Sequence, residues 1–212
     1  MKKLAASLAM VVLFFTFFVQ SSASPAKAAS NPSLMEQVQA LMDAGVMQGY
    51  DDGTLRLNSA VTRGQFAAFL VRALDLPAGD SGFKDVSPGS ALYKEISAAK
   101  KAGVLLGDNG YARPNDRVTR SDVAVMLDRA MQLKGSYTEK ATLTFTDKSQ
   151  IGKYAYESVQ RMTHYGLIQG TADNRFEPLK TATRGDSARF VYRLMETLDL
   201  FSSGPQPVTP PE

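Results

Sequence analysis

Hydrophobic residues recur at steps of three and four positions in three separate stretches of the chain. This spacing places apolar side chains on one face of a helix and polar side chains on the other. The pattern therefore predicts three amphipathic helices, each beginning just after a Thr-Arg dipeptide. The core-facing positions are Phe66, Phe69, Leu70, Ala73 and Leu74; Val123, Met126, Leu127, Ala130 and Met131; and Ser187, Phe190, Val191, Leu194 and Met195.

A shorter helical pattern precedes each of these stretches and ends near a glycine, a common residue just past a helix end. The loop that follows turns at Gly53, Gly110 or Asn174. These residue types tolerate a left-handed backbone, so this column predicts a positive φ. The apolar pairs of the short helices, with their glycines, are Val38, Leu41 and Gly45; Ile96, Ala99 and Gly103; and Val159, Met162 and Gly166.

The same order of elements occurs three times. The motif threonines Thr62, Thr119 and Thr183 are 57 and 64 residues apart. Such a period indicates one supersecondary unit used repeatedly, and a single two-helix unit buries too little apolar surface to be stable alone. We therefore predict an all-α fold, in which three helix-loop-helix repeats pack as one domain with pseudo-threefold symmetry.

The N-terminus has the pattern of a secretory signal. Lys2 and Lys3 precede an apolar run over residues 4–19, and "AKA" at residues 26–28 fits the cleavage rule. We predict cleavage after Ala28, with Ala29 as the alternative. An uncleaved membrane anchor is the rival interpretation, but the run is shorter than the roughly 20 residues that span a bilayer. After cleavage we expect no association with the membrane.

Processing also changes the charge of the chain. The full sequence has 24 basic and 21 acidic residues, and the signal removes three lysines and no acid, which leaves 21 of each. A neutral protein is not typical of nucleic-acid binding. There is no cysteine, so disulfides and thiolate metal sites are excluded. The predicted boundaries are a signal peptide at 1–28, repeats at 29–76, 77–137 and 138–200, and a Pro-rich tail at 201–212.

The repeated motif is Thr-Arg, a small residue, then Gln or Asp. Thr62 suits a helix N-cap, and Gln65 three residues later completes a capping box. Asp122 and Asp186 occupy the same column as Gln65 and favour the positive end of the helix dipole. Local helix structure therefore explains every position of the motif except the Arg.

A cation at the first helical position opposes the helix dipole, so three in register suggest a compensating partner. One hypothesis is an internal ion pair, for example with Asp85 or Asp147 of the "FKDV" and "FTDK" segments, or with the acid two positions on. The other is an anionic ligand in a cleft between repeats. The planar guanidinium of the Arg would hold the carboxylate of this ligand through two hydrogen bonds. Free N–H groups at the helix N-terminus would also bind it, and the small residue next to the Arg would leave room for its close approach. Spacing alone does not decide between them.

The Phe-x-Asp opening, the helix ending in Gly-Val or Gly-Leu, the "GYDDG" loop and Thr-Arg-x-acid together resemble the S-layer homology (SLH) repeat of bacterial cell-surface proteins. The resemblance covers roughly residues 31–200. It implies clefts between repeats that bind secondary cell-wall polymers linked to peptidoglycan, commonly through pyruvylated amino-sugar units. The ligand carboxylate is then a partner for the motif Arg. Carried over by position, the candidate binding residues are Arg63, Arg120, Arg184, Gly49, Gly107 and Gly170, with Asp85 and Asp147 binding or orienting.

This sequence departs from the family pattern at two points. The family often has Trp near the start of the first helix, where this chain has Ser33, Ala91 and Tyr154. An aromatic face for a sugar is therefore expected only at Tyr154, and we expect Arg184 of the same repeat to contribute most to binding. The first repeat also lacks a Phe-x-Asp opening, so not all three clefts are expected to be competent.

Other chemistry finds little support. His164 is the only histidine, and the Asp51-Asp52-Gly53 turn lacks the alternating ligands of a calcium loop. We predict no enzyme activity, no cofactor and no metal. The function predicted is a non-catalytic module that binds wall polymer at the cell surface. The alternative is a protein–protein module in surface-layer assembly or docking.

Overall fold

The computed structural model describes residues 31–80 and 82–201, so the predicted signal peptide and all but the first residue of the predicted tail lie outside it. The regular elements of the described chain are helices, and its only β-structure is isolated bridges. This confirms the predicted all-α class. No described helix is long and apolar enough to cross a membrane. The elements are α1 (Leu34–Asp43), α2 (Arg63–Leu74), α3 (Tyr93–Lys101), α4 (Arg120–Gln132), the 3-10 helix η1 (Lys148–Gln150), α5 (Lys153–His164) and α6 (Arg184–Thr197).

The longer helices α2, α4 and α6 begin at the predicted threonines. The hydroxyls of Thr62, Thr119 and Thr183 each accept a hydrogen bond from the backbone N–H three residues on, at 3.2, 3.2 and 3.1 Å. Capping boxes are complete at α2 and α6. At α4 the Thr119 hydroxyl also donates to the Asp122 carboxylate, at 2.9 Å. These contacts confirm the N-cap interpretation of the motif.

The loop column of glycine and asparagine has the predicted left-handed conformation, and the glycines that follow the short helices share it. The short helices α1, α3 and α5 are followed by Gly45, Gly103 and Gly166, with φ of 71°, 76° and 73°. The loop column follows the same rule, with φ of 76° at Gly53, 84° at Gly110 and 52° at Asn174. Positive φ was not predicted for one further column, that of Arg56, Arg113 and Glu177, where the structure also shows it. Nothing in those side chains signals it.

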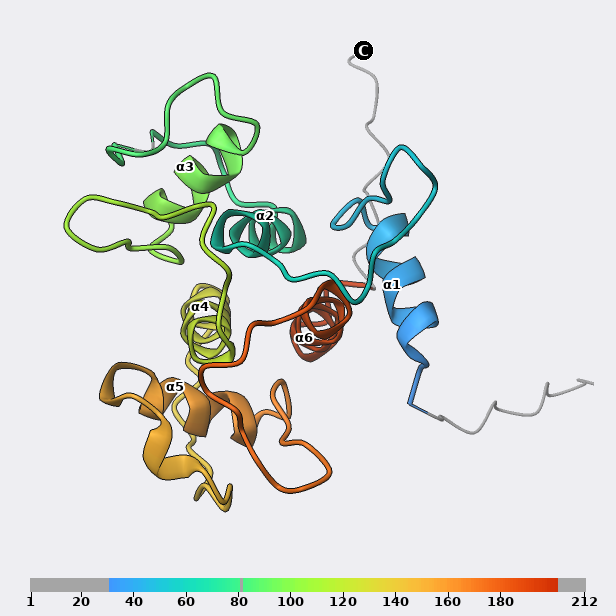
Figure 1. Cartoon of the computed structure of the whole chain (residues 1–212), viewed down its shortest axis with the longest axis vertical. Coiled ribbons are helices and arrows are strands. Elements are labelled where there is room, and N and C mark those ends of the chain that lie inside the picture. The colour runs from blue at the N-terminus through green and yellow to red at the C-terminus, as the bar shows by residue number, and fades with distance from the viewer. Residues whose placement is uncertain (1–30, 81, 202–212) are drawn as a thin grey trace, which may run out of the picture. The chain divides into compact units, whose positions relative to one another are not determined.

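Each repeat is completed by its neighbour. Helices α2, α4 and α6 contact one another, and each also packs on the short helix of the following repeat: α2 on α3, α4 on α5, and α6 on α1 (Figure 1). Within the described chain, the two helices of one repeat make no such contact. The repeats therefore depend on one another for burial, as the prediction of mutual packing requires.

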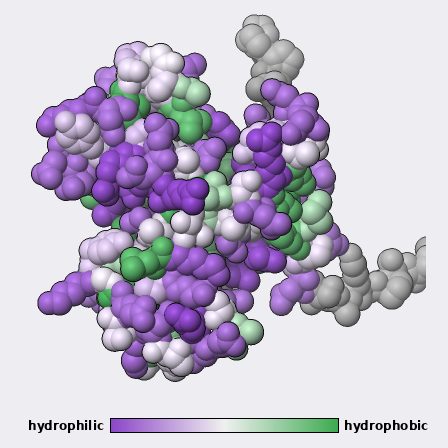
Figure 2. Space-filling view, viewed as in Figure 1, coloured by the Kyte–Doolittle hydropathy of each residue, from purple (hydrophilic) through white to green (hydrophobic). Residues whose placement is uncertain are grey.

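A ring of three backbone hydrogen bonds lies where the repeats meet. Val118 donates to the carbonyl of Val61 at 2.9 Å, Ala182 donates to Val118 at 3.0 Å, and Val61 donates to Ala182 at 3.0 Å. All three residues are fully buried. The ring closes the third repeat onto the first, which gives the described domain its pseudo-threefold arrangement. Hydrophilic residues cover most of the face in Figure 2, and hydrophobic residues reach it only in small groups.

Candidate functional site

The motif arginines reach from the start of one long helix into the loop of the next repeat. Each donates from Nε to the backbone oxygen seven residues before the following motif Thr. Nη2 of Arg120 and of Arg184 also donates to a second carbonyl, that of Gln169 at 3.0 Å and that of Gln48 at 2.7 Å. The Nε pairs are Arg63 with Ala112 (3.2 Å), Arg120 with Phe176 (2.6 Å) and Arg184 with Leu55 (3.0 Å).

The backbone N–H groups at the helix starts are occupied as well. Arg63 N–H donates to Asp116 O at 2.8 Å and Gly64 N–H to Pro114 O at 3.0 Å. A Cβ at Gly64 would lie 3.1 Å from that Pro114 oxygen, so the small residue admits the neighbouring loop. The prediction of free N–H groups beside a space for ligand is therefore wrong. The same pattern joins Arg120 to Lys180, Ser121 to Pro178, Arg184 to Ser59 and Gly185 to Leu57.

The two Phe-x-Asp carboxylates hold these loops in place. Asp147 accepts from the N–H groups of Phe176 and Glu177, at 2.7 and 2.8 Å. Burial alone would raise the pKa of Asp147, but these two hydrogen bonds outweigh it and the pKa lies below its usual range. Asp85 accepts in the same way from Ala112 and Arg113, at 2.8 and 2.7 Å. The hypothesis that these acids pair with the motif arginines is wrong, because both carboxylates orient the loops whose carbonyls those arginines contact.

The glycines Gly107 and Gly170 leave room for the Phe side chains of the two Phe-x-Asp segments. A Cβ on Gly170 would lie 2.7 Å from Cε1 of Phe145. One on Gly107 would lie 2.5 Å from the backbone oxygen of Tyr111 and 2.7 Å from Cε1 of Phe83. In the first repeat, which has no such Phe, the nearest atom to a Cβ on Gly49 is 3.6 Å away. Glycine is thus required where the Phe of the opening packs on the loop.

One cleft, here called the Arg63 cleft, has a volume of about 380 Å³. Asp122 is its central acid: the carboxylate lies 3.5 Å from Nη1 of Arg63 and accepts from the Tyr154 hydroxyl at 3.3 Å. Tyr154 and Leu179 are strongly exposed, at 65% and 77%. The walls include Gly107, Arg113, Val125, Met126 and Arg129. The cleft therefore combines cations with an apolar rim.

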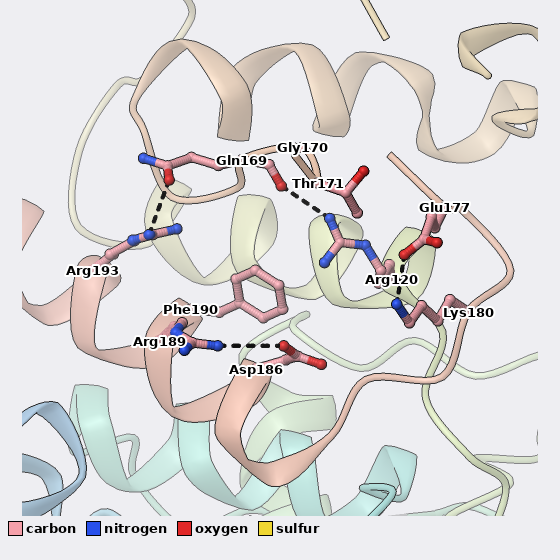
Figure 3. Close-up of a pocket in the computed structure, with 10 residues that line it drawn as sticks. All are labelled: Arg120, Gln169, Gly170, Thr171, Glu177, Lys180, Asp186, Arg189, Phe190 and Arg193. Carbon is pink, nitrogen blue, oxygen red and sulfur yellow. Dashed lines mark hydrogen bonds and ion pairs between the residues drawn. The ribbon is translucent and has the colours of Figure 1, made fainter. Parts of the chain in front are cut away.

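A second cleft, the Arg120 cleft, has a volume of about 300 Å³ and is more polar (Figure 3). Lys180 pairs with Glu177 at 2.7 Å, and Arg189 lies 3.8 Å from Asp186. Arg120 is only 9% exposed and donates to backbone carbonyls alone. Burial lowers its pKa in spite of Asp186, Glu177 and Asp147 nearby. Gly170 and Arg193 complete the wall, with Arg193 bonded to Gln169 as Figure 3 shows.

Comparison with known families decides the identity of these repeats. The profile of the S-layer homology domain matches residues 29–67, 82–124 and 144–188. The chain belongs to the S-layer homology domain family. As a member, it is a cell-surface anchoring module built of three SLH repeats.

Its relatives are much longer proteins. The chain is 32% identical over 163 residues to an amylopullulanase of Thermoanaerobacterium thermosulfurigenes, covering 75% of this chain and 9% of that protein. It is 32% identical over 169 residues to a surface-layer 125 kDa protein of Lysinibacillus sphaericus, covering 77% and 14%. It is 27% identical over 160 residues to the S-layer protein sap of Bacillus anthracis, covering 74% and 19%. The aligned region holds SLH repeats and no evident catalytic domain, and such relatives indicate a cell-surface location.

The SLH motif arginine Arg184 resembles Arg120, which lies over the rings of Phe176 and Phe190 at 5.3 and 5.7 Å. Arg184, 6% exposed, lies over the rings of Tyr50 and Phe69 at 5.1 and 5.5 Å. Burial lowers its pKa. Neither Arg184 nor Gly49 lines the two clefts described above. Tyr154 lies in the Arg63 cleft, because α5 packs on α4 of the preceding repeat, so the reason for expecting Arg184 to contribute most to binding does not hold.

The remaining candidates of the SLH chain make ordinary contacts. The His164 ring meets Tyr165 edge-on, with centroids 4.8 Å apart. Asp52 accepts from Thr54 and pairs with Arg56 at 2.8 Å, so the turn holds its own carboxylate. Among residues 31–80 and 82–201, no group of three His, Cys, Asp or Glu side chains could hold a metal ion.

Proposed function

We propose that this chain anchors to the bacterial wall by binding an anionic secondary cell-wall polymer, without catalysis, in the clefts between its repeats. The supporting observation is Arg120, a cation that is almost fully buried and whose hydrogen bonds go only to neutral carbonyl oxygens. A carboxylate entering the cleft would supply the missing charge partner. Arg forms strong paired hydrogen bonds with carboxylates.

The charge of both clefts favours the same class of ligand. The Arg120 cleft has four cationic side chains, two of which are paired internally. The Arg63 cleft has three arginines against Asp122. An excess of positive charge in a recessed site attracts anions and would be screened by salt. We take the anion to be the carboxylate of a pyruvylated amino sugar, and Tyr154 to offer its exposed ring to the sugar.

The test is co-sedimentation of the mature protein with peptidoglycan sacculi that either carry the secondary polymer or have been stripped of it by acid. We expect the protein to pellet only with sacculi that carry the polymer. Equal pelleting with stripped sacculi would assign binding to peptidoglycan itself. Failure to pellet with either, together with capture by purified surface-layer protein, would support the alternative of a protein–protein module.

A further inference from the structure

A second arginine column runs through the three long helices. Arg72, Arg129 and Arg193 each lie ten residues after the motif Thr of their repeat. Sequence analysis missed this column, because an Arg at that point of an amphipathic helix reads as an ordinary polar position. Arg129 lines the Arg63 cleft and Arg193 lines the Arg120 cleft.

The three members of this column differ in what they contact. Arg72 forms an ion pair with Glu95 at 2.5 Å. Arg193 donates to the carbonyl of Leu167 at 3.3 Å and to Oε1 of Gln169 at 3.1 Å. Arg129 makes no hydrogen bond and no ion pair with any described residue.

The acid next to Arg129 is already engaged. Asp128 accepts two hydrogen bonds from Arg161, at 2.8 and 2.6 Å, and a third from Ser158 at 2.7 Å. The acid inside the cleft, Asp122, is held by Arg63, Thr119 and Tyr154. Neither of these two carboxylates is therefore left for Arg129.

Partial burial makes this isolated charge costly. It lowers the pKa of Arg129 more than the nearby Asp128 raises it, and the Arg63 guanidinium adds a smaller lowering. An Arg keeps its proton in proteins, so the cost remains as an unpaired cation facing the cleft. A bound anion would remove this cost, whereas Arg63 already has its carboxylate and its carbonyl.

We propose that Arg129 is the residue that grips the ligand carboxylate in the Arg63 cleft, while Arg63 positions the loop and Asp122. This inference rests on the proposed function and names the contact within it. The apolar walls Val125, Met126 and Leu179 lie around the same cleft. The ligand that fits is a sugar carrying a single carboxylate beside an apolar group, rather than a hydrophilic polyanion.

The experiment follows the ε-methyl NMR signal of Met126, which lines the cleft. The probe is a synthetic pyruvylated amino-sugar disaccharide, with the same disaccharide lacking pyruvate as the control ligand. Substitution Met126→Leu assigns the signal. We expect Arg129→Ala to weaken the affinity by about 10- to 100-fold, as loss of a charged hydrogen bond does. We expect Arg129→Lys to recover only part of it, since an ammonium lacks the fork.

The matched control is Arg72→Ala, at the same position of α2 but in an internal ion pair. It should lower the thermal midpoint and leave the Met126 titration unchanged, whereas Arg129→Ala should leave the midpoint unchanged. Wild-type affinity in Arg129→Ala would overturn the inference while leaving the proposed function standing. If the wild-type protein neither responds to the disaccharide nor pellets with polymer-bearing sacculi, the proposed function itself fails.

Discussion

At the scale of single residues, Arg120 and Arg184 each donate hydrogen bonds to two backbone carbonyls. Both donate through Nε and Nη2 to carbonyls of the following repeat, and both remain cations with no carboxylate partner in an ion pair among the described residues. The two hypotheses for the motif, internal partner or external ligand, are therefore not exclusive. The internal partners of Arg120 and Arg184 are carbonyl oxygens instead of the acids that were expected, whereas Arg63 contacts both a carbonyl and the Asp122 carboxylate.

Substitution Arg184→Ala should destabilise the protein. It would remove two part-buried hydrogen bonds from the charged guanidinium, to the carbonyls of Gln48 and Leu55, a loss of about 1.5–3 kcal/mol. Urea denaturation measures the free energy of unfolding. The exposed Arg117→Ala is the control and should change it by less than about 0.5 kcal/mol. An Arg184→Ala protein as stable as wild type would show that these carbonyls need no donor.

Substitution Gly170→Ala should lower the stability of the fold, and Gly49→Ala should leave it nearly unchanged, although the two glycines occupy one column of the repeat. The new Cβ at residue 170 would meet Phe145 at 2.7 Å, and such overpacking costs about 1–3 kcal/mol. At residue 49 the nearest atom is 3.6 Å away. Thermal unfolding of the two variants checks this difference. Equal midpoints would contradict the role given to the Phe of the opening.

At the scale of helices, sequence patterns located the elements but not their partners. The N-caps at Thr62, Thr119 and Thr183 follow from residue types three positions apart, so they were predictable. Packing of α4 on α5 was not, because no local pattern says which repeat a helix will meet. For the same reason Tyr154 was associated with Arg184 of its own repeat and not with Arg63. Arg129 was overlooked because an Arg on an amphipathic helix is an ordinary polar position.

The contact between α4 and α5 depends on a buried acid. Burial alone would raise the pKa of Asp128, but hydrogen bonds from Arg161 and Ser158 outweigh it, so the folded pKa lies below the unfolded one. A depressed pKa stabilises the fold above the unfolded value of about 4, and this stabilisation is lost as the pH falls through the folded value. Asp128→Asn should therefore cost about 1.5–3 kcal/mol at pH 7, as weakening of a charged hydrogen bond does.

The same cost should shrink below about pH 4, as the wild-type carboxyl becomes protonated. Denaturant unfolding of both proteins between pH 7 and pH 3 gives the difference at each pH. The exposed Asp51→Asn is the control and should show no such trend. A difference that stays constant across this range would mean that Asp128 does not act through its charge.

At the scale of the whole domain, the ring through Val61, Val118 and Ala182 makes the three repeats one unit. The clefts arise from this arrangement, because each is built from a motif Arg of one repeat and the loop and long helix of the next. Repetition in sequence was enough to predict the closed domain. The differences among the repeats depend on single residues such as Tyr154 in the Arg63 cleft and Glu95, the ion-pair partner of Arg72, and they required the structure.

The claim that the clefts bind an anionic polymer is tested most directly by calorimetry with the isolated secondary cell-wall polymer. The polymer is titrated into the protein in two forms, one intact and one from which mild acid has removed the pyruvate groups. We predict that the intact polymer binds and that removal of the carboxylates weakens binding at least about tenfold, as expected for a lost charged contact. Equal affinity for the two polymers would contradict the account.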